Sequence, residues 1–262
     1  MKVIGIYNIK GGVGKTAAAV NLAYLSSAEG LRTLLWDLDP QAAATYYFRV
    51  RPEVKGGTKG LLRGKRGLDA AVKGTDFERL DLLPAEFSFR HMDLLLEDQK
   101  GPTKRLMRLL RPQSRSYDHC FLDCPPSISL VSENIFRAAD LLLVPVIPTT
   151  LSARTLDQLL DFLAGHAHHQ DLKVLPFFSM VDRRKRLHCE LMQRLPERYP
   201  GFLRAAIPYA SEVERMGIHR MPLIAYAPSN PAAAAYRALW TELQAALSDT
   251  ATRVAEPLPQ AV

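Results

Sequence analysis

The sequence has few cysteines and no long hydrophobic segment. Its 262 residues include three cysteines, Cys120, Cys124 and Cys189, whose number and spacing exclude a disulfide framework or a zinc site. No apolar run approaches the roughly 20 residues that a membrane-spanning helix needs. Residues 1–5 enter a strand-like stretch at once, which leaves no room for a secretory signal peptide. These absences predict a cytoplasmic protein.

Internal repeats, long linkers and changes of composition are also missing. A chain that is 47% hydrophobic and 23% charged has the composition of a soluble globular protein, and its length suits one large α/β domain. We expect residues 1–248 to form that domain. Residues 249–262 lack apolar periodicity, and we expect them to be a disordered tail.

The chain has fewer acidic than basic residues. Asp and Glu number 27 against 34 Lys and Arg, a formal net charge of +7. This balance favours polyanionic partners such as nucleic acid, although most surface cations are simply solvated. Where the positive charges cluster therefore matters more than their total.

Apolar runs alternate with helix-like segments along the chain. Strands are predicted at 1–5, 33–41, 80–84, 119–123, 141–147, 174–180 and 202–208, and helices at 17–28, 87–96, 103–110, 130–139, 156–163, 189–195 and 231–247. This order predicts a single doubly wound, mostly parallel α/β sheet flanked by helices. Ligands of such sheets bind at the carboxyl ends of the strands.

A glycine-rich loop joins the first predicted strand to the first helix. Residues 4–16 read IGIYNIKGGVGKT. Glycines let successive N–H groups turn inward and the helix N-terminus adds partial positive charge, so this order predicts a phosphate cradle. We expect Lys15 to reach the outer phosphates and the Thr16 hydroxyl to hold Mg²⁺. The predicted nucleotide-binding residues of the loop are Gly11, Gly12, Val13, Gly14, Lys15, Thr16 and Ala17.

The loop departs from the standard phosphate-loop spacing at its start. Ile9 occupies the position of the first glycine, and a second lysine, Lys10, lies inside the loop. This pattern resembles the deviant phosphate loop of the ParA/MinD family of P-loop ATPases, whose extra lysine matches Lys10. The resemblance implies ATP and Mg²⁺ as cofactors and an ATP-dependent homodimer. In that family the extra lysine reaches the nucleotide of the second subunit, so Lys10 joins Lys15 as a predicted catalytic residue.

Three aspartates follow apolar strands. Asp123 has the placement of the second phosphate-loop motif, which positions Mg²⁺. The stretch from Asp37 to Gln41 resembles the family's remaining motif, and strand alternation predicts that Asp37 and Asp39 lie on the same side. The resemblance implies that Asp39 activates the attacking water, as a catalytic residue, and that Asp37 lies behind the direct ligands of Mg²⁺. An acid pair that only caps a helix or faces solvent is the alternative.

The resemblance extends to the region of the last predicted strand. Residues 207–208, followed by a loop and helix, resemble the family's adenine-side wall, with Pro208 and Tyr209 as nucleotide-contacting residues. Family members often have Lys or Arg and then Asn after this proline. Tyr209 and Ala210 depart from that pattern.

The resemblance leaves open which surface the ATP-bound dimer binds. ParA proteins bind non-specific DNA, and MinD proteins bind membrane through a C-terminal amphipathic helix. The last predicted helix is alanine-rich and the tail has no basic face, so we expect no membrane binding. Basic residues of the C-terminal third favour non-specific duplex DNA, although a basic run is often only a solvated turn. The candidate DNA-binding residues are Arg183, Arg184, Lys185, Arg186, Arg204, Arg215 and Arg220.

The predicted function is that of a ParA-like, nucleoid-associated ATPase. Hydrolysis stimulated by a ParB-like protein or cargo adaptor would release the dimer from DNA and so position a plasmid, a chromosome or a protein assembly such as a carboxysome. A MinD-like membrane-associated ATPase is one alternative. The other is a metabolic ATP-dependent enzyme of the dethiobiotin synthetase type, which leaves the second lysine unexplained.

Overall fold

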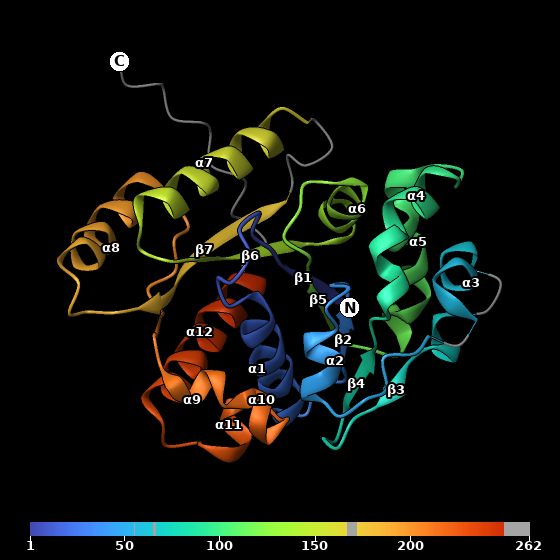
Figure 1. Cartoon of the computed structure of the whole chain (residues 1–262), viewed down its shortest axis with the longest axis horizontal. Helices are drawn as coiled ribbons and strands as arrows, with labels where there is room; N and C mark the ends of the chain where they lie inside the picture. The colour runs from blue at the N-terminus through green and yellow to red at the C-terminus, as the bar shows by residue number, and fades with distance from the viewer. Residues whose placement is uncertain (55, 65–66, 167–171, 249–262) are drawn as a thin grey trace.

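The computed structural model describes residues 1–54, 56–64, 67–166 and 172–248. These residues contain one eight-stranded sheet of order β3-β4-β2-β5-β1-β6-β7-β8 (Figure 1). Every neighbouring pair is parallel except β3 with β4. The prediction of a doubly wound, mostly parallel sheet is confirmed, whereas the predicted tail, 249–262, lies outside the described residues.

Parallel strands buried on both faces explain the continuous apolar runs of the sequence. Every residue of β6, for example, is buried. The strands of the sheet are β1 (Lys2–Ile6), β2 (Thr33–Asp37), β3 (Lys73–Gly74), β4 (Leu80–Leu83), β5 (His119–Asp123), β6 (Leu141–Val146), β7 (Lys173–Val181) and β8 (Ala206–Pro208).

Successive side chains of each strand point to opposite faces of the sheet, and each face has its own hydrophobic core. Ile4 and Ile6 pack on the face covered by the first and last helices, and Val3 packs on the other face. On the first face lie α1 (Lys15–Ala28), α2 (Ala43–Tyr47), α9 (Ser211–Glu214), α10 (Met216–His219), α11 (Leu223–Tyr226) and α12 (Pro231–Ser248). On the second lie α3 (Gly57–Arg63), α4 (Met92–Glu97), α5 (Arg105–Leu110), α6 (Leu130–Ala138), α7 (Thr150–Ala164) and α8 (Arg186–Arg198) (Figure 1).

Short 3₁₀ helices extend several connections, namely η1 (Leu68–Ala70), η2 (Phe87–His91), η3 (Pro102–Lys104) and η4 (Arg111–Arg115). No helix in the described part of the chain combines the length and hydrophobicity needed to span a lipid bilayer.

Two predicted element boundaries differ in ways that affect the site. Strand β2 ends at Asp37 rather than continuing to Gln41. Helix α8 begins at Arg186, inside the basic run, three residues before the predicted start.

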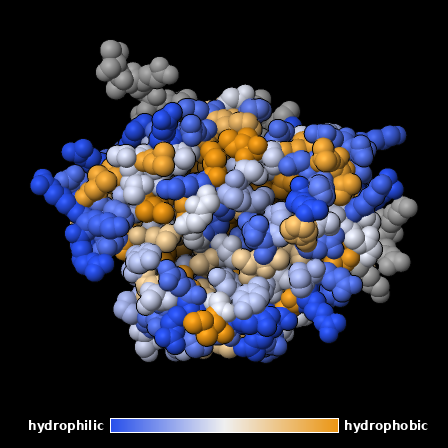
Figure 2. Space-filling model, in the orientation of Figure 1, coloured by the Kyte–Doolittle hydropathy of each residue, from blue (hydrophilic) through white to orange (hydrophobic). Residues whose placement is uncertain are grey.

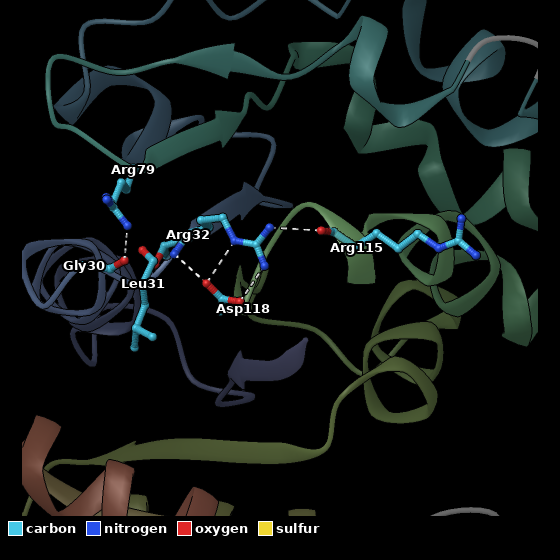
Figure 3. A network of polar contacts seen from close by, with 7 residues as sticks. Gly30, Leu31, Arg32, Arg79, Arg115 and Asp118 are labelled. Atoms are coloured by element: carbon cyan, nitrogen blue, oxygen red, sulfur yellow. Dashed lines mark hydrogen bonds and ion pairs between the residues drawn. The ribbon is translucent and has the colours of Figure 1, made fainter.

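An ionic clamp joins the starts of β2 and β5 at the amino-terminal edge of the sheet. Arg32 Nε and Nη2 donate to the two carboxylate oxygens of Asp118 at 3.1 and 2.7 Å, and Nη1 donates to the Arg115 carbonyl at 3.0 Å (Figure 3). These bonds lower the pKa of Asp118 to about 2. Because both side chains are exposed, the clamp sets the geometry of the edge more than it stabilises the fold.

Candidate nucleotide site

The phosphate loop and the buried acids meet at the carboxyl ends of three neighbouring strands. Strand register pairs Asp123 of β5 with Ile6 of β1 on one side and with Asp37 of β2 on the other. The loop that follows β1 leads directly into α1, whose first residue is Lys15. The structure therefore brings together the predicted phosphate-binding and metal-binding residues.

Buried contacts hold the phosphate loop in place. Asn8 is 2% exposed, donates from Nδ2 to the Pro145 carbonyl at 2.8 Å and accepts from the Lys10 N–H at 2.8 Å. Gly14 has a φ of +91°, and an added Cβ would lie 2.8 Å from Ser179 Oγ. Asn8 and Ser179 were missed at the sequence level, because their partners lie far away in the chain.

Gly14→Ala is expected to lower both stability and nucleotide affinity, since a left-handed residue with a side chain costs about 1–2 kcal/mol and the added methyl collides with Ser179. Gly30→Ala is the matched control, because Gly30 has a φ of +88° with no atom within 4 Å of an added Cβ. Urea unfolding and binding of a fluorescent ATP analogue measure the two effects. Both variants should lose stability, and only Gly14→Ala should lose nucleotide affinity.

The two lysines of the loop have different surroundings. Lys15 is 6% exposed, and its Nζ donates to the Lys10 carbonyl at 3.0 Å. Burial lowers the pKa of Lys15, and the charges of Asp123 and Asp39 oppose that shift. The Lys10 ammonium forms no hydrogen bond or ion pair with any described residue.

Asp123 is a buried carboxylate beside the Thr16 hydroxyl. It is fully buried, and neither carboxylate oxygen is bonded within the described part of the chain. Burial raises the pKa of Asp123 well above its usual value and the charge of Asp37 raises it further, while the nearby Thr16 hydroxyl lowers it. A divalent cation would neutralise this charge.

The residues present fit Mg²⁺ shared with a nucleotide. Mg²⁺ in nucleotide sites typically takes one or two carboxylates together with phosphates and waters. The described residues contain no cluster of three His, Cys, Asp or Glu side chains that could hold a metal unaided. Thr16 and Asp123 would therefore hold the ion jointly with the phosphates.

Asp37 ties the end of β2 to α2. Its carboxylate accepts from the Thr45 N–H at 2.8 Å, the Thr45 hydroxyl at 2.7 Å and the Asp39 N–H at 3.2 Å. Burial raises the pKa of Asp37 to about 6, against the effect of these hydrogen bonds. Sequence reasoning missed Thr45, which carries no motif. That Asp37 supports the ligands of Mg²⁺ without contacting the ion itself stays a prediction.

Asp39 lies beyond the strand. Since β2 ends at Asp37, strand alternation does not place Asp39, and the argument that put the two acids on one side was wrong. Asp39 is half-buried in a turn, where Oδ1 accepts from the Gln41 N–H at 2.9 Å. Its charge nevertheless acts on Lys15 and Asp123, which places it beside the phosphate-binding residues.

The proposed adenine-side residues lie at the end of β8, on the same edge of the sheet. The Tyr209 N–H donates to the Val181 carbonyl at 2.8 Å, and Pro208 pairs with Val181. The Tyr209 side chain is 56% exposed and its hydroxyl donates to Glu214 at 3.2 Å. Their contact with the base stays a prediction.

The candidate DNA-binding residues occupy three places. The basic run, Arg183–Arg186, follows β7 on the nucleotide side of the sheet and leads into α8, over which Figure 2 shows a strongly hydrophilic surface. Arg204 instead precedes β8, and its N–H donates to Glu242 of α12. Arg215 lies 3.7 Å from Glu212, and Arg220 stacks on Tyr46 at 4.5 Å.

Within the basic run, the four cations are not equivalent. Arg184 pairs with Asp182 at 2.9 Å and Arg186 with Glu190 at 2.8 Å. Arg183 and Lys185 are exposed and form no ion pair with a described residue. These two charges are available to an external anion.

Comparisons with known proteins agree with this site. The AAA_31 family, described as an AAA domain, matches residues 1–174. The chain is 29% identical over 249 residues to the sporulation initiation inhibitor protein Soj of Bacillus subtilis, which covers 93% of this chain and 98% of Soj. It is also 35% identical over 146 residues to the chromosome partitioning protein ParA of Myxococcus xanthus, covering 55% of this chain and 52% of that protein.

A solved structure shows the ligands that such a site accepts. Cobyrinic acid a,c-diamide synthase from Mycobacterium smegmatis, with bound ATP analogue and magnesium, is similar with a TM-score of 0.82 at 26% identity, covering 97% of this chain and 98% of that one. With the unpartnered Asp123 carboxylate beside Thr16, this likeness makes ATP and Mg²⁺ the cofactors of the site. The chain belongs to the AAA_31 family and is a P-loop ATPase of the ParA/MinD type.

Proposed function

We propose that the chain is a ParA-like ATPase whose ATP-bound homodimer binds duplex DNA non-specifically and leaves it after partner-stimulated hydrolysis. The observation that carries this proposal is the contrast between the backbone of Lys10, which is hydrogen-bonded, and its side-chain ammonium. Its N–H donates to Asn8 and its carbonyl accepts from Lys15, so the backbone is fixed at both ends while the ammonium is left without a partner among the described residues. Such a side chain is suited to a ligand outside its own loop.

Each residue of the site has a distinct part in this proposal. Lys15 contacts the outer phosphates, and Asp39 orients the attacking water and accepts its proton. Thr16 and Asp123 would hold Mg²⁺, which would supply positive charge at the phosphates. Phosphoryl transfer depends mainly on such positioning and charge stabilisation.

Lys10 acts on the nucleotide of the partner subunit. Two lysines in one loop repel each other unless several phosphate charges lie between them, and Lys15 already occupies the inside of its own loop. When Lys10 reaches across a face-to-face dimer, its ammonium meets the phosphate charges of the partner's nucleotide and stays apart from Lys15 of its own loop. Hydrolysis then requires the dimer, as with an arginine finger supplied in trans.

DNA binding is supported by position and by charge. Arg183 and Lys185 lie on the edge of the sheet that carries the phosphate loop, so dimerisation through that edge places two copies of the basic run in one assembly. Phosphate contacts of this kind are independent of sequence and sensitive to salt. The proposal places the protein on the nucleoid, with a ParB-like protein or cargo adaptor as the activator of hydrolysis.

The double variant Arg183→Ala/Lys185→Ala tests the DNA interface. With two fewer phosphate contacts per subunit, the slope of log K against log salt should flatten by about 2 per subunit, and DNA affinity should fall. Arg115→Ala is the control, because the Arg115 side chain extends away from the clamp at the opposite edge (Figure 3). Fluorescence anisotropy of labelled duplex DNA with ATP measures both quantities. Equal slopes in all three proteins would exclude this interface.

A metabolic function is the second candidate, because the synthase from M. smegmatis is similar over nearly its whole length. ATP turnover measured with and without duplex DNA separates the two. Stimulation by DNA together with an added partner protein supports the partition function. Turnover that depends only on a small metabolite contradicts it and favours a synthase.

A further inference from the structure

Asn8 joins the phosphate loop to the centre of the sheet. It is the second residue after β1, and it is buried. The pairing of β1 with β6 continues to Tyr7, whose N–H donates to the Leu143 carbonyl at 3.0 Å. Beyond Tyr7 the backbone leaves the sheet and turns into the loop. Asn8 therefore lies where the strand ends and the loop begins.

The side-chain amide of Asn8 replaces a backbone hydrogen bond of the sheet. Leu143 and Pro145 are two residues apart in β6, so their carbonyls point to the same side of the strand. In a regular parallel pair, the Pro145 carbonyl would accept from the N–H of Ile9, two residues after Tyr7. It accepts instead from Asn8 Nδ2 at 2.8 Å. The amide thus satisfies β6 while the backbone is free to leave the sheet.

The other end of the amide fixes the backbone of Lys10. Asn8 Oδ1 accepts from the Lys10 N–H at 2.8 Å, which closes a turn between an asparagine side chain and the second residue after it. The Lys10 carbonyl accepts from Lys15 Nζ at 3.0 Å. Both polar backbone groups of Lys10 are held by side chains, whereas its ammonium has no partner among the described residues. Asn8 therefore ties the backbone of Lys10 to β6.

We propose that Asn8 is a positioning residue for Lys10, because it holds the turn from which the lysine side chain reaches the nucleotide of the partner subunit. This inference rests on the proposed role of Lys10 in trans. A long side chain stabilises a transition state only when its backbone is held in place, since misplacement by about 1 Å can cost about 10²-fold in rate. Asn8 itself touches no reacting atom. Its loss should impair the site of the partner subunit and spare its own.

Two substitutions of Asn8 separate the turn from the sheet contact. Asn8→Ala and Asn8→Ser both remove the donor to Pro145, and both should lower the urea midpoint of unfolding, because a buried carbonyl loses its partner. Serine still offers an oxygen to the N–H two residues further on, and alanine does not. Single-turnover hydrolysis should therefore fall about 10²-fold in Asn8→Ala and less in Asn8→Ser. Affinity for a fluorescent ATP analogue should be retained in both.

Asn134→Ala is the matched control for these variants. Asn134 is also fully buried and also joins separate segments, since it accepts from the Arg105 N–H and donates to the Pro102 carbonyl, each at 2.7 Å. It belongs to α6 and not to the phosphate loop. Its loss should lower stability and leave the rate of hydrolysis unchanged. A wild-type rate in Asn8→Ala, or equal rates in Asn8→Ala and Asn8→Ser, would overturn the inference.

Mixing of subunits shows which site depends on Asn8. An equimolar mixture of Asn8→Ala and Asp39→Ala should recover about a quarter of the wild-type rate, because the Asn8→Ala subunit keeps its own site and receives a well-placed Lys10 from its partner. Asn8→Ala mixed with Lys10→Ala should stay inactive, since neither subunit supplies a well-placed lysine.

The opposite pattern, with recovery only in the mixture with Lys10→Ala, would show that Asn8 serves its own site. That result contradicts the inference and leaves the proposed function intact. A mixture of Lys10→Ala with Asp39→Ala provides the reference. If that reference also fails to recover activity, the role of Lys10 in trans is wrong, and the inference about Asn8 fails with it.

Discussion

Replacing Lys10 with alanine is expected to leave ATP binding almost unchanged and to reduce hydrolysis by about 10³-fold or more, the range measured for charges supplied in trans to phosphoryl transfer. Binding survives because Lys15, the loop glycines and Asp123 are untouched. Hydrolysis falls because the charge that develops on the transferred group loses its stabilising cation. Equilibrium binding of a fluorescent ATP analogue and single-turnover hydrolysis separate the two effects.

The control for this variant is Lys10→Arg, which keeps the charge and should retain part of the activity. A merely structural role for Lys10 is already served by its backbone N–H and carbonyl, which alanine preserves. Hydrolysis by Lys10→Ala at the wild-type rate would show that Lys10 is not a catalytic residue.

The second large effect is expected for Asp123→Asn, with opposite signs for stability and activity. In the ligand-free protein the carboxyl group is fully buried and repelled by Asp37, and these two effects outweigh the opposing effects of Thr16 and Lys15. Removing that charge should raise the free energy of unfolding by at least about 1 kcal/mol. Hydrolysis should fall by about 10²-fold or more, because Mg²⁺ loses a carboxylate that holds it.

Urea unfolding without nucleotide and steady-state hydrolysis with ATP and Mg²⁺ measure these two changes. Leu122→Ala, one residue earlier in β5, is the matched control, since it should lower stability by opening a cavity in the core. A loss of stability in Asp123→Asn without nucleotide would contradict the account of Asp123 as a destabilising buried charge.

The local parts of the site were predictable from the sequence. The phosphate loop is a continuous stretch in which glycines, Lys15 and Thr16 stand at fixed spacing, and α1 follows it directly. Asp123 was predicted because an apolar strand ending in an acid places that acid at the carboxyl edge of a parallel sheet. Parallel pairing of β1, β2 and β5 then brings the two together.

The contacts that hold the site in shape could not be predicted, because they join distant parts of the chain. Asn8 bonds a carbonyl 137 residues away, and the need for glycine at position 14 depends partly on Ser179. The extent of β2 was mispredicted, since the strand ends at Asp37, whose carboxylate bonds Thr45 of α2 instead of the chain continuing as a strand to Gln41. The pairs of Arg184 with Asp182 and of Arg186 with Glu190 join residues only two and four apart, so they were open to prediction and were missed.

The central claim is that Lys10 acts on the nucleotide of the partner subunit. An experiment that mixes two inactive variants tests this claim most directly. Lys10→Ala and Asp39→Ala should each be inactive alone. In their heterodimer, the subunit that carries Lys10→Ala keeps its own Asp39 and receives Lys10 from its partner. An equimolar mixture with free exchange of subunits should therefore recover about a quarter of the wild-type hydrolysis rate, since half of the dimers have one working site of two. If Lys10 acts only within its own subunit, neither site works and the mixture stays inactive.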